Sequence, residues 1–368
     1  MTLPILRPTV AEVDLKKLSR NLHKIKMQVG EGVGILVPLK ANAYGHGAVE
    51  VGQFLEEQTL CQFFGTASVE EGMQLRSAGI KMPILVLGSI YPFEAFEYAI
   101  ENNLAVTIAS RQAAQAVCQI SEKLGKKAFC HVKQDTGMGR IGTRRGGVMD
   151  VIEILAGHPN IILDGFYSHL SSVDTDAPFT EEQIGYYRDT LTNISLRGIH
   201  INHCHLAASA AVEKRPDVYY DMVRPGYSAY GLREGFEPIL SFKTRIVYLK
   251  DLPAGSSVSY GRSFMASQNM RVATLPVGYG DGYLRDFSNK AEVLVRGNRC
   301  RILGNVTMDM MMIDVTNVPH VSVGDEVALV GRQGDEEITW AELAKIAGTI
   351  DYELCTLLQA RVPRTYKK

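Results

Sequence analysis

Short apolar runs alternate with amphipathic stretches through the first two-thirds of the chain. Helical periodicity is clearest at Val69–Gly79, Gln112–Leu124 and Thr180–Leu196. The strand-like runs are Gly34–Leu39, Cys61–Thr66, Pro83–Leu87, Ala105–Ala109, Ala128–Val132, Ile161–Tyr167, Ile199–Cys204 and Asp221–Arg224. Regular alternation predicts a parallel sheet with helices outside it. Because there are about eight strand–helix units, the pattern favours an α/β chain built as a (β/α)8 barrel.

The pattern changes after Gly231. The later runs are separated by turn residues rather than helices, which predicts a mainly antiparallel β domain; they are Ile246–Leu249, Arg271–Val277, Glu292–Val295 and Glu326–Leu329. One short helix is expected at Thr339–Ala347, because Thr339 suits the N-cap and Gly348 the stop. The segment Arg7–Leu15 alternates like a strand and is expected to pair with the C-terminal domain. We therefore predict a barrel over residues 10–235 and a C-terminal β domain over 236–368, to which the segment 1–14 adds a strand.

Composition excludes several classes of protein. The chain has 368 residues, 46% of them hydrophobic and 21% charged, and a net charge of -1. This balance gives no reason to expect nucleic acid or an anionic membrane surface as a partner. Neither a membrane-spanning run nor a secretory signal is evident. The six cysteines are scattered without a C-x-x-C pair, which is typical of reduced core thiols in a cytoplasmic protein.

Ionisable and small residues gather at the carboxyl ends of the predicted strands, where barrels place their active sites. They are Lys40 and Tyr44 after the first run, Lys133 to Arg140 after the fifth, Ser168 and His169 after the sixth, His203 to Ser209 at the seventh, and Arg224 to Tyr227 at the eighth. A half-buried ammonium such as that of Lys40 is costly unless it has a partner or a lowered pKa. A lowered pKa is what Schiff-base chemistry needs, although a solvated strand-end lysine is the alternative for this residue alone.

Ser209 and Gly226 follow the last two strands, where such barrels usually bind phosphate through backbone N–H groups and a hydroxyl. A lysine together with a phosphate cradle suggests pyridoxal phosphate. His169 could stack on this cofactor or be a satisfied core histidine, and Ser209 could simply cap a helix. Arg224 could donate a hydrogen bond to the pyridine nitrogen or form a salt bridge with a carboxylate.

Three histidines in His200–His205 raise the alternative of a catalytic metal centre. His203 and His205 point to one side of a strand, with His169 on the neighbouring strand. No aspartate or glutamate stands near enough in this run to complete a ligand set. We therefore predict no metal.

The β domain adds further candidates. Tyr260 lies in a turn-like stretch, Ser257–Arg262, and Asp309 stands among apolar residues. Tyr279 and Tyr283 flank a glycine-rich loop that suits a pocket mouth. The structural alternatives are tyrosines that pack by their rings, a turn-capping aspartate and a plain turn.

Taken in order, these motifs resemble those of the alanine racemases, pyridoxal-phosphate enzymes of fold type III. The matching stretches run from Arg7 to Arg364, nearly the whole chain; they are KANAYGHG at 40–47, DTGMGR at 135–140, RPG at 224–226, SYG at 259–261, GYGDGY at 278–283, MD at 308–309 and RVPR at 361–364. The family is expected to combine an N-terminal barrel with a C-terminal β domain, and to interconvert L- and D-alanine.

The resemblance implies a role for each candidate residue. Lys40 would hold the cofactor as a Schiff base and act as the base for the D-enantiomer. Tyr260 would be the base for the L-enantiomer, reaching in from the other subunit of a homodimer. Arg224 would bond the pyridine nitrogen and be held by His205, and His169 would lie against the ring. The phosphate would be bound by Tyr44, Ser209, Gly226 and Tyr227. Arg140 would bond the phenolate and Tyr260, with Lys133 as a carbamylated lysine that orients it, and the substrate would be lined by Met308, Asp309 and Tyr283.

Elementary chemistry agrees with the roles of the two bases and of the two arginines. Racemisation removes the Cα proton on one face and returns it on the other, which two bases on opposite faces do simply. A tyrosine is a poor base near neutral pH unless a cation lowers its pKa, and Arg140 could supply that cation. An always-protonated arginine at the pyridine nitrogen would disfavour ring protonation and limit side reactions.

Two departures from the family pattern bear on the substrate. Ala360 stands where some relatives have a phosphate-binding tyrosine, and Ala208 replaces a more usual asparagine. We therefore expect alanine as substrate with a possible side activity on serine. Supply of D-alanine for peptidoglycan is the role expected from the family.

Two other classes of pyridoxal-phosphate protein are alternatives to this interpretation. A barrel-fold amino-acid decarboxylase would usually carry an acid where Arg224 stands. A non-catalytic cofactor-binding protein would resemble the barrel alone and would leave the β domain and Tyr260 unexplained.

Overall fold

The computed structural model describes residues 6–144 and 146–368. The chain forms two compact units, each of which is described by itself. One consists of Ser19–Ala43 with Ala48–Ala229, and the other of the described part of Met1–Leu18 with Tyr44–Gly47 and Tyr230–Lys368. We call them the barrel unit and the β unit.

The barrel unit contains an eight-stranded parallel sheet in the order β8-β7-β6-β5-β4-β3-β2-β9. Its strands are β2 (Gly34–Pro38), β3 (Phe63–Thr66), β4 (Ile84–Val86), β5 (Leu104–Ile108), β6 (Ala128–Lys133), β7 (Ile161–Tyr167), β8 (His203–His205) and β9 (Met222–Val223). The two outer strands meet through a parallel bridge between Ala208 and Arg224 and a bond from the Asp221 backbone N–H to the Cys204 carbonyl. The sheet therefore closes on itself, and the predicted (β/α)8 barrel is confirmed.

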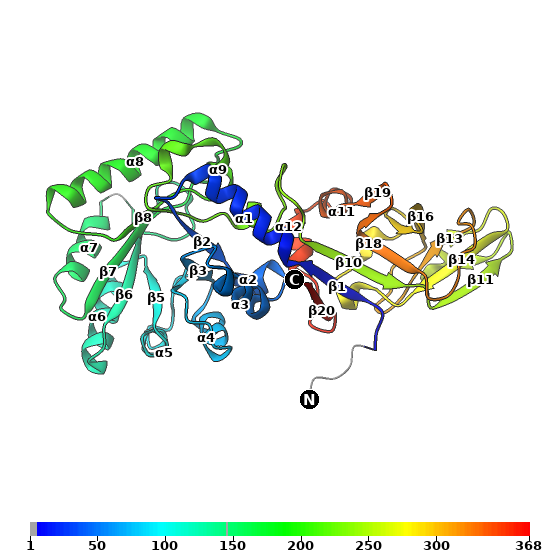
Figure 1. Cartoon of the computed structure of the whole chain (residues 1–368), viewed down its shortest axis with the longest axis horizontal. Helices are drawn as coiled ribbons and strands as arrows, with labels where there is room; N and C mark the ends of the chain where they lie inside the picture. The colour runs from blue at the N-terminus through cyan, green and yellow to red at the C-terminus, as the bar shows by residue number, and fades with distance from the viewer. Residues whose placement is uncertain (1–5, 145) are drawn as a thin grey trace. The chain divides into compact units, whose positions relative to one another are not determined.

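Helices follow most strands and lie on the outer side of the sheet (Figure 1). They are α3 (Ala48–Gln58), α4 (Val69–Ser77), α5 (Ala95–Glu101), α6 (Arg111–Leu124), α7 (Val148–Ala156), α8 (Ala177–Leu196), α9 (Ser209–Lys214), η1 (Pro216–Val218) and α10 (Gly226–Ala229). Ser68, Ser110 and Asp176 cap α4, α6 and α8 with their side-chain oxygens. The three helices expected from periodicity are confirmed, with ends shifted by up to three residues.

One predicted strand is shorter than expected. The apolar run Ile199–Cys204 was expected to form a strand throughout, but β8 begins only at His203. The backbone N–H of Ile199 instead bonds the Ile194 carbonyl, and Gly198 takes a φ of 66°. Ile199 therefore closes the last turn of α8 rather than opening the strand.

The β unit is built on a ten-stranded sheet whose main path runs β11-β14-β17-β16-β15-β18-β10-β1-β20. Its strands are β1 (Val10–Asp14), β10 (Leu240–Arg245), β11 (Tyr248–Leu252), β14 (Met270–Leu275), β15 (Glu292–Val295), β16 (Asn298–Leu303), β17 (Met311–Asp314), β18 (Glu326–Gln333), β19 (Glu336–Ile338) and β20 (Arg364–Lys367), with a separate hairpin of β12 (Ser257–Val258) and β13 (Phe264–Met265). Every pairing is antiparallel except that of β1 with β20, so the predicted mainly antiparallel domain is confirmed.

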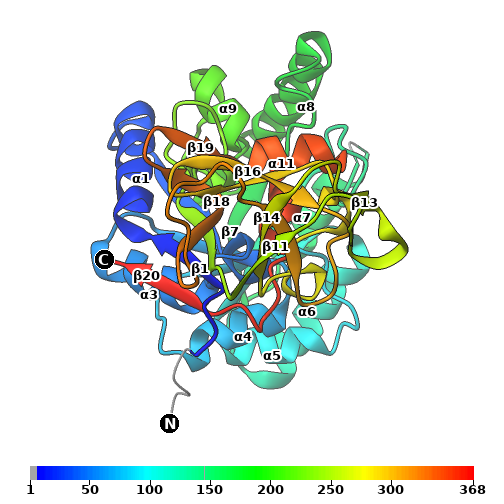
Figure 2. The ribbon, with the colours of Figure 1, turned by 90° about the vertical axis from the view of Figure 1, so that its right-hand side faces the viewer.

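Two local predictions in this unit are also confirmed. β1, within the expected segment Arg7–Leu15, pairs with β10 and β20. Helix α11 (Trp340–Ala347), seen with β16 and β18 in Figure 2, is capped by Thr339 and ends at Gly348 in the left-handed conformation. The other helical segments are α1 (Leu15–Val29), α2 (Lys40–Tyr44), α12 (Asp351–Thr356), η2 (Tyr260–Arg262), η3 (Tyr279–Asp281) and η4 (Arg285–Phe287).

Within the described residues, none of the helices has the length and apolar character needed to cross a membrane. All six cysteines are free, and Cys204 alone among them is only partly buried.

Candidate active site

Lys40 stands where β2 ends and a left-handed turn begins. Ala41, Asn42, Ala43 and Tyr44 all have φ between 52° and 55°, a conformation that costs residues with a side chain about 1–2 kcal/mol each. Three bonds hold the turn: Ala43 N–H to the Leu39 carbonyl (2.7 Å), Ala41 N–H to Glu71 Oε1 (2.7 Å) and Ala48 N–H to Asn42 Oδ1 (2.9 Å). The tight turn fixes the direction in which Lys40 leaves the strand.

The charges around Lys40 favour its neutral form. Burial lowers the pKa of the Lys40 ammonium, the Arg140 guanidinium lowers it further, Glu71 opposes the shift, and Arg224 adds to it. A lysine with a lowered pKa is the nucleophile and base that Schiff-base chemistry requires.

Lys133, at the end of β6, belongs to the same group of cations. Burial, together with Arg224, Arg140 and Lys40, lowers its pKa to about 7, against a smaller opposing effect of Asp135. The Lys133 Nζ lies 5.0 Å from the centroid of the Tyr167 ring, and the Arg224 Cζ lies 5.3 Å from it. The buried aromatic face of Tyr167 thus lies beside two of these cations.

Arg140 is carried by the loop that follows β6. Asp135 Oδ1 accepts the backbone N–H groups of Gly137 (3.1 Å) and Gly139 (3.0 Å). The loop is closed by Thr143, whose N–H bonds the Lys133 carbonyl (2.9 Å) and whose carbonyl accepts the Asp135 N–H (3.0 Å). The side chain of Arg140 is exposed, so it is available to a ligand.

Arg224 is buried at the end of β9, and both of its terminal nitrogens donate hydrogen bonds. It donates to His205 Nδ1 (2.6 Å) and to the carbonyls of His205 (3.0 Å), Ser168 (2.6 Å) and Leu206 (3.1 Å). The structure therefore brings Arg224 and His205 together. The partner of Arg224 is a neutral imidazole, because burial and then the Arg224 charge hold the His205 pKa well below its usual range.

The other candidates of the barrel unit lie on the neighbouring loops. His169 is half-buried after β7, and burial followed by Arg224 and Lys133 keeps its pKa well below the usual value. Ser209 begins α9, and its Oγ accepts the N–H of Ser228 in α10 (3.1 Å). Gly226 and Tyr227 open α10. The N-terminal ends of two short helices thus lie side by side with a hydroxyl between them.

Tyr44 belongs to the β unit. Its ring packs against Tyr230, with centroids 5.0 Å apart, and against Tyr352, with centroids 5.4 Å apart.

Tyr260 projects from the β unit with 74% of its surface exposed. Its backbone carbonyl accepts Asn305 Nδ2 (2.8 Å), and Ser259 Oγ donates to the Asn305 carbonyl (2.8 Å). Ser259 itself has a φ of 67°. The turn that carries Tyr260 is therefore tied to the segment that leads to Met308, and the phenol stands clear of both.

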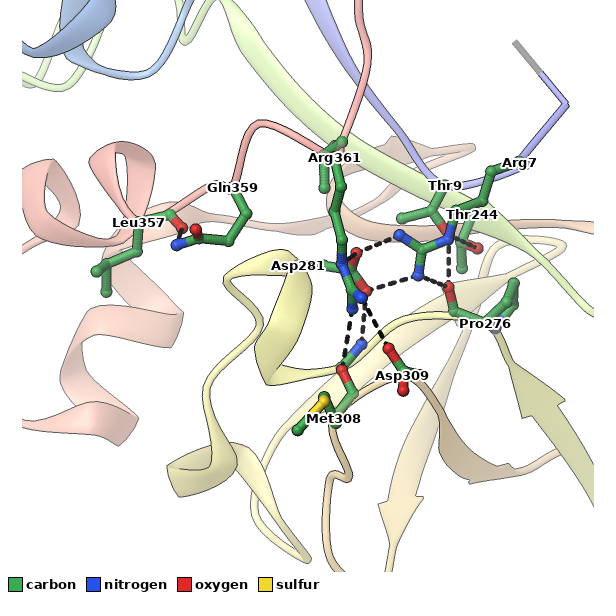
Figure 3. Close-up of polar contacts among 12 residues, drawn as sticks. Arg7, Thr9, Thr244, Pro276, Asp281, Met308, Asp309, Leu357, Gln359 and Arg361 are labelled. Carbon is green, nitrogen blue, oxygen red and sulfur yellow. Dashed lines mark hydrogen bonds and ion pairs between the residues drawn. The ribbon is translucent and has the colours of Figure 1, made fainter.

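Met308 and Asp309 are fixed by a network around the buried carboxylate of Asp281 (Figure 3). Asp281 Oδ1 accepts Arg361 Nε (2.7 Å), and the same guanidinium donates to Asp309 Oδ1 (2.7 Å) and the Met308 carbonyl (3.1 Å). Arg7 bonds both oxygens of Asp281, with Nη2 at 2.7 Å from Oδ2. The conformation of the Met308–Asp309 loop thus depends on Arg361.

The prediction of Tyr283 at the site entrance is wrong. Tyr283 is only 2% exposed, and its ring packs on Phe287, with centroids 4.7 Å apart, and on Phe242. Tyr279, in the same glycine-rich loop, is 41% exposed. The side chain of Tyr283 fills the core of the β unit, and of the two tyrosines Tyr279 is the one that a ligand can reach.

Sequence reasoning missed three side chains around the candidate residues: Tyr167 and Glu71 in the barrel unit and Asp281 in the β unit. Tyr167 ends an apolar strand run and resembles a core aromatic residue. Glu71 lies in the first turn of α4, where an acidic residue is common in any helix. Asp281 was seen within its motif, but only its burial reveals that it organises Arg7 and Arg361.

The metal alternative finds no support in this geometry. Both ring nitrogens of His205 are engaged, Nδ1 with Arg224 and Nε2 with His131 Nδ1 (3.0 Å). In the part of the chain that the structure describes, no group of three or more His, Cys, Asp or Glu side chains could hold a metal ion.

Comparison with known proteins identifies the family of this chain. Residues 13–234 match the family model of the alanine racemase N-terminal domain, and residues 239–366 match that of the alanine racemase C-terminal domain. An alanine racemase of Halothermothrix orenii is 40% identical, covering 99% of this chain and 98% of its own. One from Symbiobacterium thermophilum is 41% identical, with 100% and 99% covered. The solved structure of the Clostridium difficile alanine racemase superposes with a TM-score of 0.93 at 35% identity, covering 99% of this chain and 97% of that one.

Both family models, relatives matched over their full length, and a shared fold therefore lead to one conclusion. The chain belongs to the alanine racemase family of isomerases.

Proposed function

We propose that this chain interconverts L- and D-alanine with two bases, Lys40 on one face of the substrate and Tyr260 on the other, in a site completed by pyridoxal phosphate and by a second subunit. The observation that carries the proposal is the group of Lys40, Lys133, Arg140 and Arg224 at the carboxyl ends of the barrel strands. Burial and the neighbouring cations lower the pKa of both lysines, Lys40 and Lys133.

The residues present fit pyridoxal phosphate. The cations of this group lower the pKa of Lys40 and of Lys133, and the carboxylates of Glu71 and Asp135 only partly oppose this effect. An anionic ligand would relieve the repulsion among the cations. Ser209 and the first residues of α9 and α10 form a donor set suited to a phosphate group. Lys40 would hold the aldehyde carbon, Arg224 the ring nitrogen, and Tyr44, Ser209, Gly226 and Tyr227 the phosphate. His169 would lie against the ring.

When bound, pyridoxal phosphate supplies an electron sink that makes the Cα proton of the amino acid acidic. The protein supplies the positions of the bases. Neutral Lys40 Nζ would take or return the proton on the face of the D-enantiomer, and the Tyr260 hydroxyl oxygen would do so on the face of the L-enantiomer. Arg140, which is exposed on its loop, would orient Tyr260.

A second subunit is proposed because Tyr260 lies on an exposed apolar surface. Tyr260, Met308, Met310 and Tyr279 are between 41% and 74% exposed, although large apolar side chains are usually buried. Asn305 and Thr307 tie the turns of Tyr260 and Tyr279 to the Met308–Met310 segment, so these side chains share one region of the β unit. Burial of this region against another copy would bring Tyr260 to the site of its partner.

Lys133 fits the proposed carbamylated lysine. Carbon dioxide reacts with neutral amines, and a pKa of about 7 leaves a large neutral fraction at physiological pH. The carbamate would place a negative charge among Arg140, Arg224 and Lys40 and would hold Arg140 in place.

Two alanines bear on the range of substrates. Ala208 N-caps α9 without a side-chain bond, and Ala360 is exposed before Arg361. Neither adds a polar group near the substrate, so we propose a slow side reaction with serine. The proposed role is the cytoplasmic supply of D-alanine for peptidoglycan, and it rests on the family alone.

Isotope exchange at Cα tests the two bases separately. In D2O, the wild-type enzyme with pyridoxal phosphate should deuterate both enantiomers of alanine. The circular dichroism of a solution of either enantiomer should fall to zero. Tyr260→Phe should still deuterate D-alanine but lose deuteration of L-alanine, because Lys40 remains on its own face. Tyr248→Phe, which alters an exposed tyrosine of β11, is the control. Equal loss of both exchange reactions in Tyr260→Phe would reject the assignment of the faces.

A further inference from the structure

Behind Arg224, a line of buried polar side chains extends through the barrel interior. His205 Nδ1 bonds Arg224 (2.6 Å), and its Nε2 lies 3.0 Å from His131 Nδ1. His131 Nε2 lies 3.2 Å from Asp164 Oδ2, and Asp164 Oδ1 accepts Asn202 Nδ2 (2.9 Å). Both histidines are fully buried and Asp164 is 8% exposed. The line leads from the carboxyl end of the barrel to a carboxylate deeper in it.

The direction of every proton in this line is determined by its two ends. A guanidinium can only donate, so His205 Nδ1 must accept and His205 Nε2 must carry the proton. That proton points at His131 Nδ1, which must therefore accept, and the His131 proton is left on Nε2. A carboxylate can only accept, and Asp164 accepts the hydrogen bond from His131 Nε2–H. One arrangement of protons satisfies all the partners.

The backbone makes specific room for this line. β6 and β7 pair Cys130 with Leu163 but His131 with Gly165, so Asp164 is an extra residue in β7. Such bulges redirect a side chain and are frequent beside active sites. A Cβ on Gly165 would lie 2.0 Å from His131 Nδ1, so only glycine leaves space for the imidazole. Tyr167 stacks on His205 at 4.7 Å and Phe63 packs edge-on against His131 at 6.1 Å.

We infer that His131 and Asp164 are positioning residues that hold His205 in one tautomer and thereby fix Arg224 for the cofactor ring. This inference rests on the proposed placement of Arg224 at the pyridine nitrogen. Without the carboxylate, His131 and then His205 could exchange tautomers. His205 would then present an N–H to the N–H of Arg224, and the guanidinium would have to move.

The electrostatics of the buried groups agree with neutral imidazoles ending at an anion. Burial lowers the pKa of His131 against the raising effect of Asp164. Burial raises the pKa of Asp164, but hydrogen bonds from His131 and Asn202 outweigh it and hold the pKa below its usual value. At neutral pH the line thus carries one negative charge at Asp164 and one positive charge at Arg224.

Nitrogen-15 NMR of the holoenzyme labelled on histidine tests the proton arrangement directly. Both His131 and His205 should be neutral with the proton on Nε2, and neither should become protonated as the pH is lowered to 6. A proton on His205 Nδ1 would overturn the inference, whatever the enzyme proves to catalyse. This measurement needs no variant and does not depend on turnover.

Asp164→Asn tests the consequence for Arg224. We expect tautomer exchange at His131 and His205, a shifted visible absorption band of the cofactor, and kcat lowered about 10-fold with KM for alanine changed less than about 2-fold. Asp150→Asn makes the same change on the exposed side of α7 and should alter none of these. Unchanged tautomers and kcat in Asp164→Asn would overturn the inference. Absence of alanine racemisation in the wild type would instead reject the proposed function.

Discussion

The sequence predicts a role in the site for some side chains of this chain but not for others. Lys40, Lys133 and Arg224 interrupt apolar runs at strand ends, so the sequence alone predicts them at the rim of a barrel. His131, Asp164 and Tyr167 lie inside strand runs, and their partners come from other strands. No local pattern distinguishes them from core residues, because their importance depends on register and on a bulge that only the fold shows.

The cations around Lys133 make its modification dependent on pH. Its pKa of about 7 means that the neutral amine, which reacts with carbon dioxide, increases from pH 6 to pH 8. At a fixed concentration of 13C-labelled carbon dioxide, the carbamate signal in carbon-13 NMR should increase several-fold over this range. Lys133→Arg should abolish the signal. An equal signal at both pH values, or one that persists in Lys133→Arg, would contradict the prediction.

The buried carboxylate of Asp281 predicts a large effect on stability. Asp281→Asn leaves the partly exposed guanidinium groups of Arg7 and Arg361 facing a neutral amide, and hydrogen bonds to a charged group contribute about 1.5–3 kcal/mol. The urea midpoint at pH 7 and fixed protein concentration should fall accordingly. Burial raises the Asp281 pKa, but Arg7, Gly278 and Arg361 hold it below its usual value. The stabilisation is therefore present at neutral pH and is lost as the pH falls below the ordinary carboxyl range.

A matched variant separates burial from charge in this prediction. Asp325→Asn removes a carboxylate that two nitrogens of Arg296 bond at 2.8 and 3.0 Å on the surface. Exposed pairs contribute little, so its urea midpoint should change much less than that of Asp281→Asn. Equal shifts in the two variants would show that the burial of Asp281 is unimportant.

At the level of elements, the left-handed turn after β2 is the feature that the sequence hides best. Of these four residues only Asn42 is of a type that favours positive φ, and the following glycines predict only a loop. Hydrophobic patterning succeeded where apolar residues recur along one buried helix face, as in α6, and where a strand is almost wholly buried, as in β15. It missed β10, where Ser241, Lys243 and Arg245 make half of a short strand polar.

Strain in this turn can be measured with glycine. Ala41 is exposed and has a φ of 52°, so Ala41→Gly should raise the free energy of unfolding by roughly 0.5–1 kcal/mol. The same substitution at Ala116, inside helix α6, should lower it by about 1 kcal/mol. Urea unfolding of both variants gives the comparison. Destabilisation by Ala41→Gly would show that the left-handed conformation carries no strain.

For the whole molecule, eight alternating units and a change of pattern after Gly231 were enough to predict two units and their architecture. Full-length similarity to alanine racemases, over 99% of the chain for the relative from Halothermothrix orenii, agrees with both. The assembly, in contrast, is proposed from two observations: Lys40 and Tyr260 belong to different units, and the Tyr260 side chain is exposed.

Mixed dimers test this central proposal most directly. Lys40→Ala and Tyr260→Phe chains, neither of which is expected to racemise alanine alone, are co-expressed with different tags, and dimers carrying both tags are isolated. Such a dimer contains one site with both Lys40 and Tyr260 if the subunits share their sites, and none if each subunit is complete by itself. We predict recovery of about half the wild-type rate of alanine racemisation per dimer. Verified mixed dimers without any recovery would contradict the shared site.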